Sequence, residues 1–183
     1  MTVQAGELIA VSGPSGSGKS TLLRAIADLD PHQGQVYLDD AEQSSMPAHL
    51  WRQQVGLLPA DSHWWFDTVA PHFPSVNAHW LTQLGFEDEV LKWDVARLSS
   101  GERQRLALLR LLCHEPKALL LDEASANLDE TNTRRVETII KDYARERHAP
   151  VMWISHDPDQ INRIAQRRAL ISDGRLIVEE TPQ

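Results

Sequence analysis

Short apolar runs alternate with amphipathic stretches along most of the chain. Four runs are almost continuously apolar, which is typical of strands buried on both faces of a parallel sheet. They are residues 7–11, 55–58, 118–121 and 151–154. The spacing of apolar residues between them predicts helices over residues 19–28, 47–54, 101–114, 130–147 and 159–166. This alternation predicts an α/β fold with a mainly parallel core sheet.

Two more strands are predicted, over residues 34–38 and 175–178, the second as one arm of a hairpin that turns at Asp173 and Gly174. The pattern changes between residues 60 and 98, which contain four of the six tryptophans and few charges. We expect a small helical lobe there. Its aromatic residues either fill the core of the lobe or form a docking surface.

Length, charge and cysteine content narrow the class of protein. The 183 residues suffice for one domain with a sizeable core. The net charge of −8 disfavours a nucleic-acid partner, which needs Lys and Arg at phosphates. Cys113 is the only cysteine, so a reducing compartment fits best. No apolar run approaches the roughly 18 residues of a membrane-spanning helix, and we expect a cytoplasmic protein.

A glycine-rich motif lies between the first predicted strand and the first predicted helix. Residues 13–20 match the pattern G-x-x-x-x-G-K-[ST], in which glycines let backbone N–H groups surround phosphate oxygens. In this context a chance glycine-rich turn is the weaker interpretation. Lys19 is expected to reach the β- and γ-phosphates, and the Ser20 hydroxyl to ligate Mg²⁺. The predicted nucleotide-binding residues here are Gly13, Pro14, Ser15, Gly16, Ser17, Gly18, Lys19, Ser20 and Thr21.

Three polar residues follow two other predicted strands. Asp122 and Glu123 come directly after the run 118–121, and His156 follows the run 151–154. Open parallel sheets bind ligands at the carboxyl ends of their strands, so we expect all three at one edge. Asp122 would hold Mg²⁺ or its water, Glu123 would act as general base on an attacking water, and His156 would hydrogen-bond a γ-phosphate. Ordinary turn residues are the alternative interpretation.

A second anion-binding helix end is predicted at residues 99–102. Ser99 and Glu102 have the spacing of a capping box. The free N–H groups at such a helix start, beside Gly101, can also bind an anion. Because one nucleotide already has the loop 13–20, Ser99 and Gly101 are expected to face the nucleotide of a second copy in a head-to-tail dimer.

Taken in order, these motifs resemble those of the ATP-binding cassette (ABC) ATPase family over nearly the whole chain. They are GPSGSGKST at 13–21, LSSGE at 98–102, LLLDE at 119–123, ANLD at 126–129, and His156. The stretches RQQVGLL, DTV, DETN and SHDPDQI are most similar to a short bacterial subfamily associated with iron export.

The resemblance implies two ATP molecules, with Mg²⁺, between two subunits, with Ser99 and Gly101 on the γ-phosphate across the interface and Asp129 helping to form it. The partner would be a second copy or another ABC ATPase. The small lobe would contact integral membrane permease subunits, which places the chain on the inner face of the cell membrane. One domain, 1–183, would then comprise a nucleotide-binding core (1–59 and 99–183) and the helical lobe (60–98).

The sequence departs from the family pattern at three places. Ala60 occupies the position of a glutamine that ligates Mg²⁺ and holds water, and Asp61 is the adjacent candidate to replace it. Twelve residues precede Gly13, so the N-terminal antiparallel strand and its adenine-stacking aromatic residue are expected to be missing. Ser100 and Glu102 replace a glycine and a glutamine.

The first functional interpretation is an ATPase subunit that drives a membrane transporter by nucleotide-dependent dimer closure. One alternative is a soluble ABC ATPase of DNA repair or translation, which would bring a coiled coil, a second cassette or a basic surface. Another is a degenerate cassette that binds ATP with little turnover; Ala60 favours it, whereas Glu123 and His156 oppose it. A P-loop kinase would leave residues 98–102 unexplained.

Overall fold

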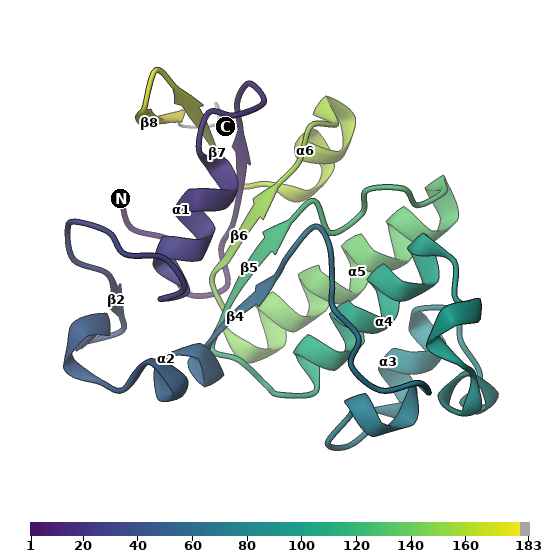
Figure 1. Ribbon diagram of the computed structural model, residues 1–183. Helices are drawn as coiled ribbons and strands as arrows, with labels where there is room; N and C mark the ends of the chain where they lie inside the picture. Colours follow the sequence, from purple (N-terminus) through teal and green to yellow (C-terminus); the bar gives the residue numbers. More distant parts are fainter. Residues whose placement is uncertain (180–183) are drawn as a thin grey trace.

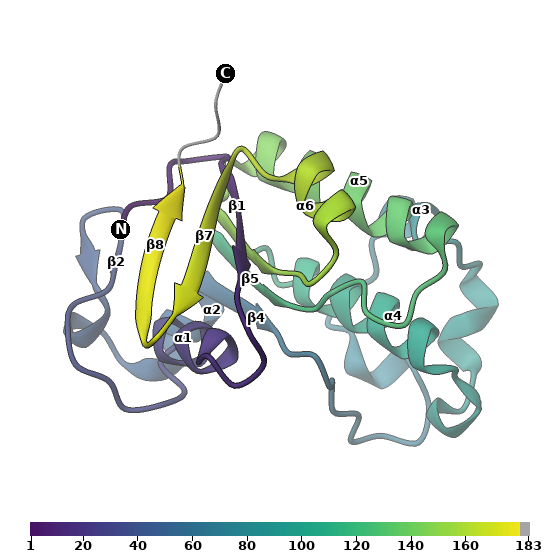
Figure 2. The ribbon, with the colours of Figure 1, turned by 90° about the horizontal axis from the view of Figure 1, so that it is seen from above.

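A single twisted sheet with helices on both faces organises the computed structural model, which describes residues 1–179 (Figures 1 and 2). The strand order is β4-β5-β6-β1-β7-β8, and the first five of these strands are mutually parallel, whereas β8 is antiparallel to β7. The strands are β1 (Leu8–Ser12), β4 (Val55–Leu58), β5 (Ala118–Asp122), β6 (Val151–Ile154), β7 (Arg167–Ser172) and β8 (Arg175–Glu179). The predicted α/β fold with a mainly parallel sheet is confirmed.

Each face of the sheet carries its own apolar cluster. On one face, Leu23 of α1 (Lys19–Ile26), Ala27 directly after that helix and Trp51 of α2 (Ala48–Gln54) pack on the sheet. The other face is covered by α4 (Ser100–Leu112), α5 (Glu130–Arg147) and α6 (Pro158–Ile164), as Figure 1 shows. The central strands are therefore apolar on both sides, which explains their continuous hydrophobic runs.

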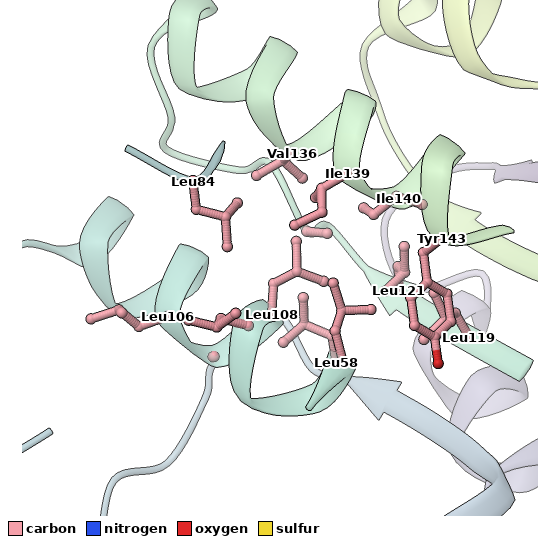
Figure 3. Close-up of a cluster of buried hydrophobic side chains, with 14 of the residues drawn as sticks. Leu58, Leu84, Leu106, Leu108, Leu119, Leu121, Val136, Ile139, Ile140 and Tyr143 are labelled. Carbon is pink, nitrogen blue, oxygen red and sulfur yellow. The ribbon is translucent and has the colours of Figure 1, made fainter. Parts of the chain in front are cut away.

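Residues 60–98 form short helices that share the second cluster. They are η2 (Ala70–His72), α3 (Ala78–Gln83), η3 (Asp88–Lys92) and η4 (Val95–Arg97). Figure 3 shows Leu84 of this segment beside Leu106 and Leu108 of α4, with Val136 of α5 opposite. The segment is thus anchored to the main core by leucine packing.

The predicted strand over residues 34–38 is wrong in extent. Only Tyr37–Leu38 (β2) pairs, with Ala41–Glu42 (β3), ahead of a 3₁₀ turn at Gln43–Ser45 (η1). Gly34 has a left-handed φ of 99°, which interrupts extended backbone. The hairpin at Asp173 and Gly174 is confirmed between β7 and β8.

Helix ends also differ from prediction by two residues. The helix predicted over 19–28 ends at Ile26, because Asp28 takes a left-handed φ of 58°. The helix predicted to end at residue 166 ends at Ile164, because the Gln166 backbone N–H already donates to Leu8 of β1. None of the helices described over residues 1–179 combines the length and apolar character needed to cross a membrane.

Candidate functional site

Three neighbouring parallel strands deliver the predicted site residues to one edge of the sheet. In the sheet, Asp122 of β5 is level with Ile154 of β6, which is level with Val11 of β1. Beyond these residues the chain continues into Glu123, His156 and the loop 13–20, respectively. Parallel strands end at a common edge, so segments far apart in sequence meet there.

The loop 13–20 connects β1 to α1 with three glycines in conformations that other residues rarely adopt. Gly13, Gly16 and Gly18 have φ of 146°, 75° and 96°. At Gly13 a Cβ atom would also lie 2.4 Å from the carbonyl oxygen of Ile171 in the adjacent strand β7. Gly16 and Gly18 have open space where a Cβ would project. The loop can therefore bring its backbone close to a ligand.

Hydrogen-bond donors gather at this loop. The Lys19 ammonium donates to the carbonyls of Gly13 and Pro14, both at 2.9 Å, and the side chain is only 7% exposed. Gly18 precedes α1 without a side-chain cap, so N–H groups of the first turn are left for another acceptor. The buried Ser17 hydroxyl has no hydrogen-bond partner among the described residues. Five predicted residues, Pro14, Ser15, Gly16, Ser20 and Thr21, are exposed. This donor set fits a polyphosphate.

Asp122 and Ser20 supply oxygen atoms suited to a hard cation. Asp122 is buried at the end of β5, and no hydrogen bond or ion pair engages its carboxylate within residues 1–179. Ser20 lies exposed in the first turn of α1, a helix that packs against β4 and β5. The described part of the chain holds no cluster of three His, Cys, Asp or Glu side chains able to bind a metal. A Mg²⁺ ion at these two residues fits when phosphate and water oxygens complete its ligands.

Glu123 and His156 meet across the ends of β5 and β6. The Oε1 atom of Glu123 lies 3.3 Å from Nε2 of His156, and both side chains are partly exposed. Glu123 has a left-handed φ of 52°, a conformation that costs energy for a non-glycine residue. Two backbone bonds hold it there: Glu123 N–H donates to Ile154 O at 3.1 Å, and Ala126 N–H donates to Glu123 O at 2.9 Å. A carboxylate beside an imidazole at this edge can accept a proton from bound water.

The predicted capping box at the start of α4 is confirmed. The Ser99 hydroxyl accepts from the Glu102 N–H at 3.2 Å, and the Glu102 carboxylate accepts from the Ser99 N–H at 2.8 Å. Gly101 is close to the segment that follows β5, because a Cβ there would lie 3.0 Å from Leu128. At the end of that segment Asp129 caps α5 by accepting from Asn132 N–H, a hydrogen bond that lowers the pKa of Asp129.

The structure does not bring every predicted site residue together within one chain. Helices α1 and α4 lie on opposite faces of the sheet, as Figures 1 and 2 both show. No hydrogen bond links Ser99 or Gly101 to the loop 13–20 among the residues described. The other predicted residues share the sheet edge. Ser99 and Gly101 therefore need a separate explanation.

Sequence reasoning missed a buried polar network behind the Glu123 and His156 pair. In this network the hydroxyls of Ser125 and Ser155 donate to the side-chain carbonyl of Gln160. The available signal was Gln160 itself, which precedes Ile161 and lies four residues before the buried Ile164. A glutamine on the apolar side of a short helix indicates an internal hydrogen-bond partner.

A groove of about 410 Å³ lies between the segment after β4 and helix α4. Arg110 of α4 lies there with its guanidinium carbon 4.7 Å from the ring centres of both Trp64 and Trp65. Burial lowers the pKa of Arg110, and no carboxylate pairs with it in the described structure. Three polar groups in the same part of the molecule are buried and have no hydrogen-bond partner within residues 1–179: Nη1 of Arg110, Nε1 of Trp64 and the Ser62 hydroxyl. Because Trp65 is 63% exposed, the groove is open to another molecule.

Comparison with known proteins gives one family match and many relatives. The model of the ABC transporter family matches residues 1–126. The probable iron export ATP-binding protein FetA of Escherichia coli (strain K12) is 36% identical over 174 residues, which cover 88% of this chain and 77% of FetA. The aliphatic sulfonates import ATP-binding protein SsuB of Cupriavidus necator is 35% identical over 193 residues, covering 98% of this chain. The chain spans 62% of that SsuB.

Solved structures share the fold. One titled as a bacterial Atm1-family ABC exporter with ATP bound is 26% identical, with a TM-score of 0.82 over 95% of this chain and 33% of that one. Another, titled as the dimeric post-hydrolysis state of the ATP-binding cassette MJ0796 bound to ADP and Pi, has a TM-score of 0.80. It is 23% identical, and the match covers 97% of this chain and 88% of the MJ0796 chain.

Proposed function

Because the chain belongs to the ABC transporter family and is an ATP-binding ATPase of that family, we propose that it hydrolyses MgATP to drive a membrane transporter. The observation that carries this proposal is the 3.3 Å approach of Glu123 to His156, at the sheet edge from which the loop 13–20 also leaves. A polyphosphate site and a candidate base are thus neighbours. That combination suits cleavage of the terminal phosphate by water.

The loop 13–20 and Lys19 hold the phosphates in this mechanism. Backbone N–H groups at the start of α1 point toward the oxygens, and the Ser17 hydroxyl supplies one more donor. Lys19 exchanges its bonds to the Gly13 and Pro14 carbonyls for bonds to phosphate oxygens. Binding in this way places the terminal phosphate beside the ends of β5 and β6.

The Ser20 hydroxyl and Asp122, directly or through water, would hold Mg²⁺. When bound, the ion offsets negative charge on the phosphates. Asp122 is suited to this role because its carboxylate is buried and engages no other side chain of the described residues. Its place at the end of β5 also separates its function from that of Glu123, whose carboxylate is directed to His156.

Glu123 accepts the proton of the attacking water, and His156 hydrogen-bonds the terminal phosphate. The left-handed backbone at Glu123 is held by bonds at its own N–H and C=O, which limits the directions its carboxylate can take. His156 emerges from the adjacent strand and lies on the Glu123 side of the site. The two groups act on the same reacting centre.

Two copies of the chain, or this chain with another ABC ATPase, complete two sites. Ser99 and Gly101 begin α4 on the face opposite α1, so they complete the nucleotide site of a facing subunit. Gly101 touches the segment that ends at Asp129, which places that segment at the same contact. ATP bound between the subunits closes the dimer, and closure moves the membrane partner.

Permease subunits dock on the groove beside α4. Trp65 in the groove and the neighbouring Phe66 are exposed and offer apolar contact, and the partly buried Arg110 lacks a carboxylate partner among the described residues. A loop of the permease that carries an acidic side chain satisfies this charge. Residues 60–98 then serve as the docking lobe, and residues 1–59 and 99–183 as the nucleotide-binding core. Docking places the protein peripherally on the inner face of the membrane.

The test measures release of inorganic phosphate from ATP by the purified chain, with Mg²⁺ and with EDTA in its place. We expect release that depends on Mg²⁺ and rises when the permease is reconstituted with the chain. ATP binding without phosphate release in either state contradicts the proposal and supports the alternative of a binding module with little turnover.

A further inference from the structure

Gln160 is a buried glutamine that joins the loops after β5 and β6. Its side chain is 1% exposed. Oε1 accepts from the hydroxyls of Ser155 at 2.8 Å and Ser125 at 3.0 Å. Nε2 also donates to the Ser125 hydroxyl, at 2.8 Å. One side chain on α6 thus binds two loops that are 30 residues apart in the sequence.

These are the loops that carry the candidate catalytic pair. Ser125 follows Glu123 by two residues, and Ser155 directly precedes His156. The Ser155 hydroxyl also accepts from the Asp157 N–H at 3.1 Å, which fixes the turn on the other side of His156. The distance between Glu123 and His156 therefore depends on two serines that share one amide.

An ion pair determines which way the amide of Gln160 faces. Nε2 donates to Oε1 of Glu137, at 3.2 Å, and Glu137 is 4% exposed. Arg163 donates to both carboxylate oxygens of Glu137, at 2.7 and 3.3 Å, and Arg134 lies 3.5 Å away. A carboxylate accepts hydrogen bonds only, so the NH₂ group must face Glu137 and the carbonyl must face the hydroxyls. Helices α5 and α6 thereby hold the orientation of Gln160.

We propose that Gln160 is a positioning residue that keeps Glu123 and His156 in register for ATP cleavage. It acts on the pair through its hydrogen bonds with Ser125 and Ser155. The proposal rests on the proposed function, because it concerns the pair assigned to that reaction. Since Ser125 lies in the segment between Glu123 and Asp129, the same amide also links His156 to the segment assigned to the dimer contact.

Removing the hydrogen bonds without removing volume tests the first step. In Gln160→Leu the two hydroxyls lose their shared acceptor, and the two loops can shift relative to each other. We expect kcat for ATP hydrolysis to fall by about ten- to hundredfold, the scale of a displacement of about 1 Å at a reacting centre. KM should change less than about twofold, because none of the hydrogen bonds of Gln160 within residues 1–179 reaches the loop 13–20.

A charge exchange separates positioning from mere stability. Gln160→Glu places a second carboxylate against Glu137 in a buried site, so we expect a comparable loss of kcat. Adding Glu137→Gln puts an amide at position 137 opposite the carboxylate at position 160, so that one group again donates and the other accepts. The carboxylate at position 160 can also accept from the hydroxyls of Ser125 and Ser155. We expect the double variant to recover at least about tenfold of kcat over Gln160→Glu. A residue needed only for folding gives no such recovery in protein that is already folded.

The matched control is Gln43→Leu. Gln43 is also a buried glutamine, but its Nε2 donates to the carbonyls of Ala25 and Ile26 at the far end of α1. Thermal unfolding checks that it loses stability comparably to Gln160→Leu. Its kcat should remain within about twofold of wild type. Equal losses of kcat in the two variants at equal stability overturn the positioning role.

A readout that does not need turnover distinguishes failure of this inference from failure of the proposed function. The imidazole signals of His156 in ¹H–¹⁵N spectra should move in Gln160→Leu and in Glu123→Gln, and stay unchanged in Gln43→Leu. Unmoved His156 signals in Gln160→Leu overturn the positioning role. A wild-type chain that releases no phosphate contradicts the proposed function alone, and the spectra still decide the positioning.

Discussion

The carboxylate of Glu123 lies 3.3 Å from Nε2 of His156, although 33 positions separate the two residues in sequence. Glu123 reaches this place with a left-handed backbone clamped to the end of β6. Such a conformation is retained only where surrounding bonds hold it, and here one bond comes from Ile154 of the strand that leads to His156 and the other from Ala126 in the segment after Glu123. The pair is therefore a built feature of the adjacent strand ends.

Glu123→Gln is expected to bind ATP as wild type does and to lose turnover. The amide has the size of the carboxylate but cannot accept a proton from water, so kcat should fall by about 10²- to 10⁴-fold. Phosphate release and calorimetric ATP affinity are measured on the same preparation. Wild-type turnover in this variant would remove Glu123 from the mechanism.

Lys19→Met is expected to weaken ATP binding. The variant removes the one ammonium group held at the loop by the Gly13 and Pro14 carbonyls and keeps most of the side-chain volume. Loss of a hydrogen bond to a charged group costs about 1.5–3 kcal/mol, which is about a ten- to 150-fold rise in Kd. Calorimetry at matched Mg²⁺ measures it. An unchanged Kd would contradict the phosphate-loop assignment.

Ser99→Arg is expected to prevent nucleotide-dependent dimerisation. In the Glu123→Gln background, saturating MgATP should give a dimer in sedimentation velocity, and the added arginine should give a monomer because its bulk occupies the contact. The arginine also removes an N-cap, worth about 1 kcal/mol. Asn77→Ala is the control. Asn77 is the N-cap of α3, and its Oδ1 accepts from Trp80 N–H. This variant should leave the dimer intact. A Glu123→Gln chain that stays monomeric with MgATP and its partner present contradicts the shared-site model.

The parts of the fold that are specified locally could be predicted from sequence. Continuous apolar runs identify β5 and β6 because these strands are buried on both faces, and Ser99 with Glu102 identifies a helix start from three-residue spacing. The resemblance to the ABC family, including its iron-export members, is confirmed by the family match and by FetA. Strand direction alone predicts that Glu123 and His156 lie at the same edge of the sheet.

The parts of the fold and of the site that depend on long-range packing could not be predicted from sequence. Gln160 has partners from α5 and from two loops, and only the assembled sheet edge brings them together. Sequence alone does not tell which tryptophans of residues 60–98 belong to the core and which to a docking surface, because the burial of a side chain depends on the elements packed around it. The structure divides them: Trp64, Trp80 and Trp93 pack against the core cluster, whereas Trp65 is exposed. The core interpretation is confirmed for these three tryptophans, and the docking surface stays a prediction for Trp65.

Acidification is expected to destabilise the chain through His72. This imidazole is 4% exposed, and its Nε2 accepts from the N–H groups of Trp65 and Phe66, both at 3.0 Å. Burial lowers the pKa of His72 below its usual 6.5. As the pH falls below about 6.5, the folded protein therefore binds fewer protons than the unfolded chain does. Stability is thus fully present above about pH 6.5 and is lost as pH falls.

The His72 prediction is checked by chemical unfolding between pH 7.5 and 5.5. His72→Phe keeps a ring but lacks the acceptor, so it should cost about 1–3 kcal/mol at pH 7.5, for the N–H groups left unpaired. Its free energy of unfolding should depend less on pH than that of wild type. Parallel pH profiles would show that His72 binds protons equally in the folded and unfolded states, which contradicts the prediction.

Ala60 stands where the resemblance to the ABC ATPase family implies a glutamine that binds Mg²⁺ and water. Ala60 and Asp61 are exposed just beyond β4, whose residue Leu58 is level with Leu121, next to Asp122. A carboxylate is a good ligand for a hard cation, so we expect Asp61 to replace the missing amide. Asp61→Ala should then lower kcat by about tenfold or more, and adding Ala60→Gln should restore part of it. Steady-state ATP hydrolysis with the membrane partner, at several Mg²⁺ concentrations, measures both the loss and the partial recovery.

Asp61→Asn is the control for shape, because its amide keeps an oxygen ligand while losing the charge. An Asp61→Ala enzyme as active as wild type would leave Asp61 an ordinary turn residue after Pro59.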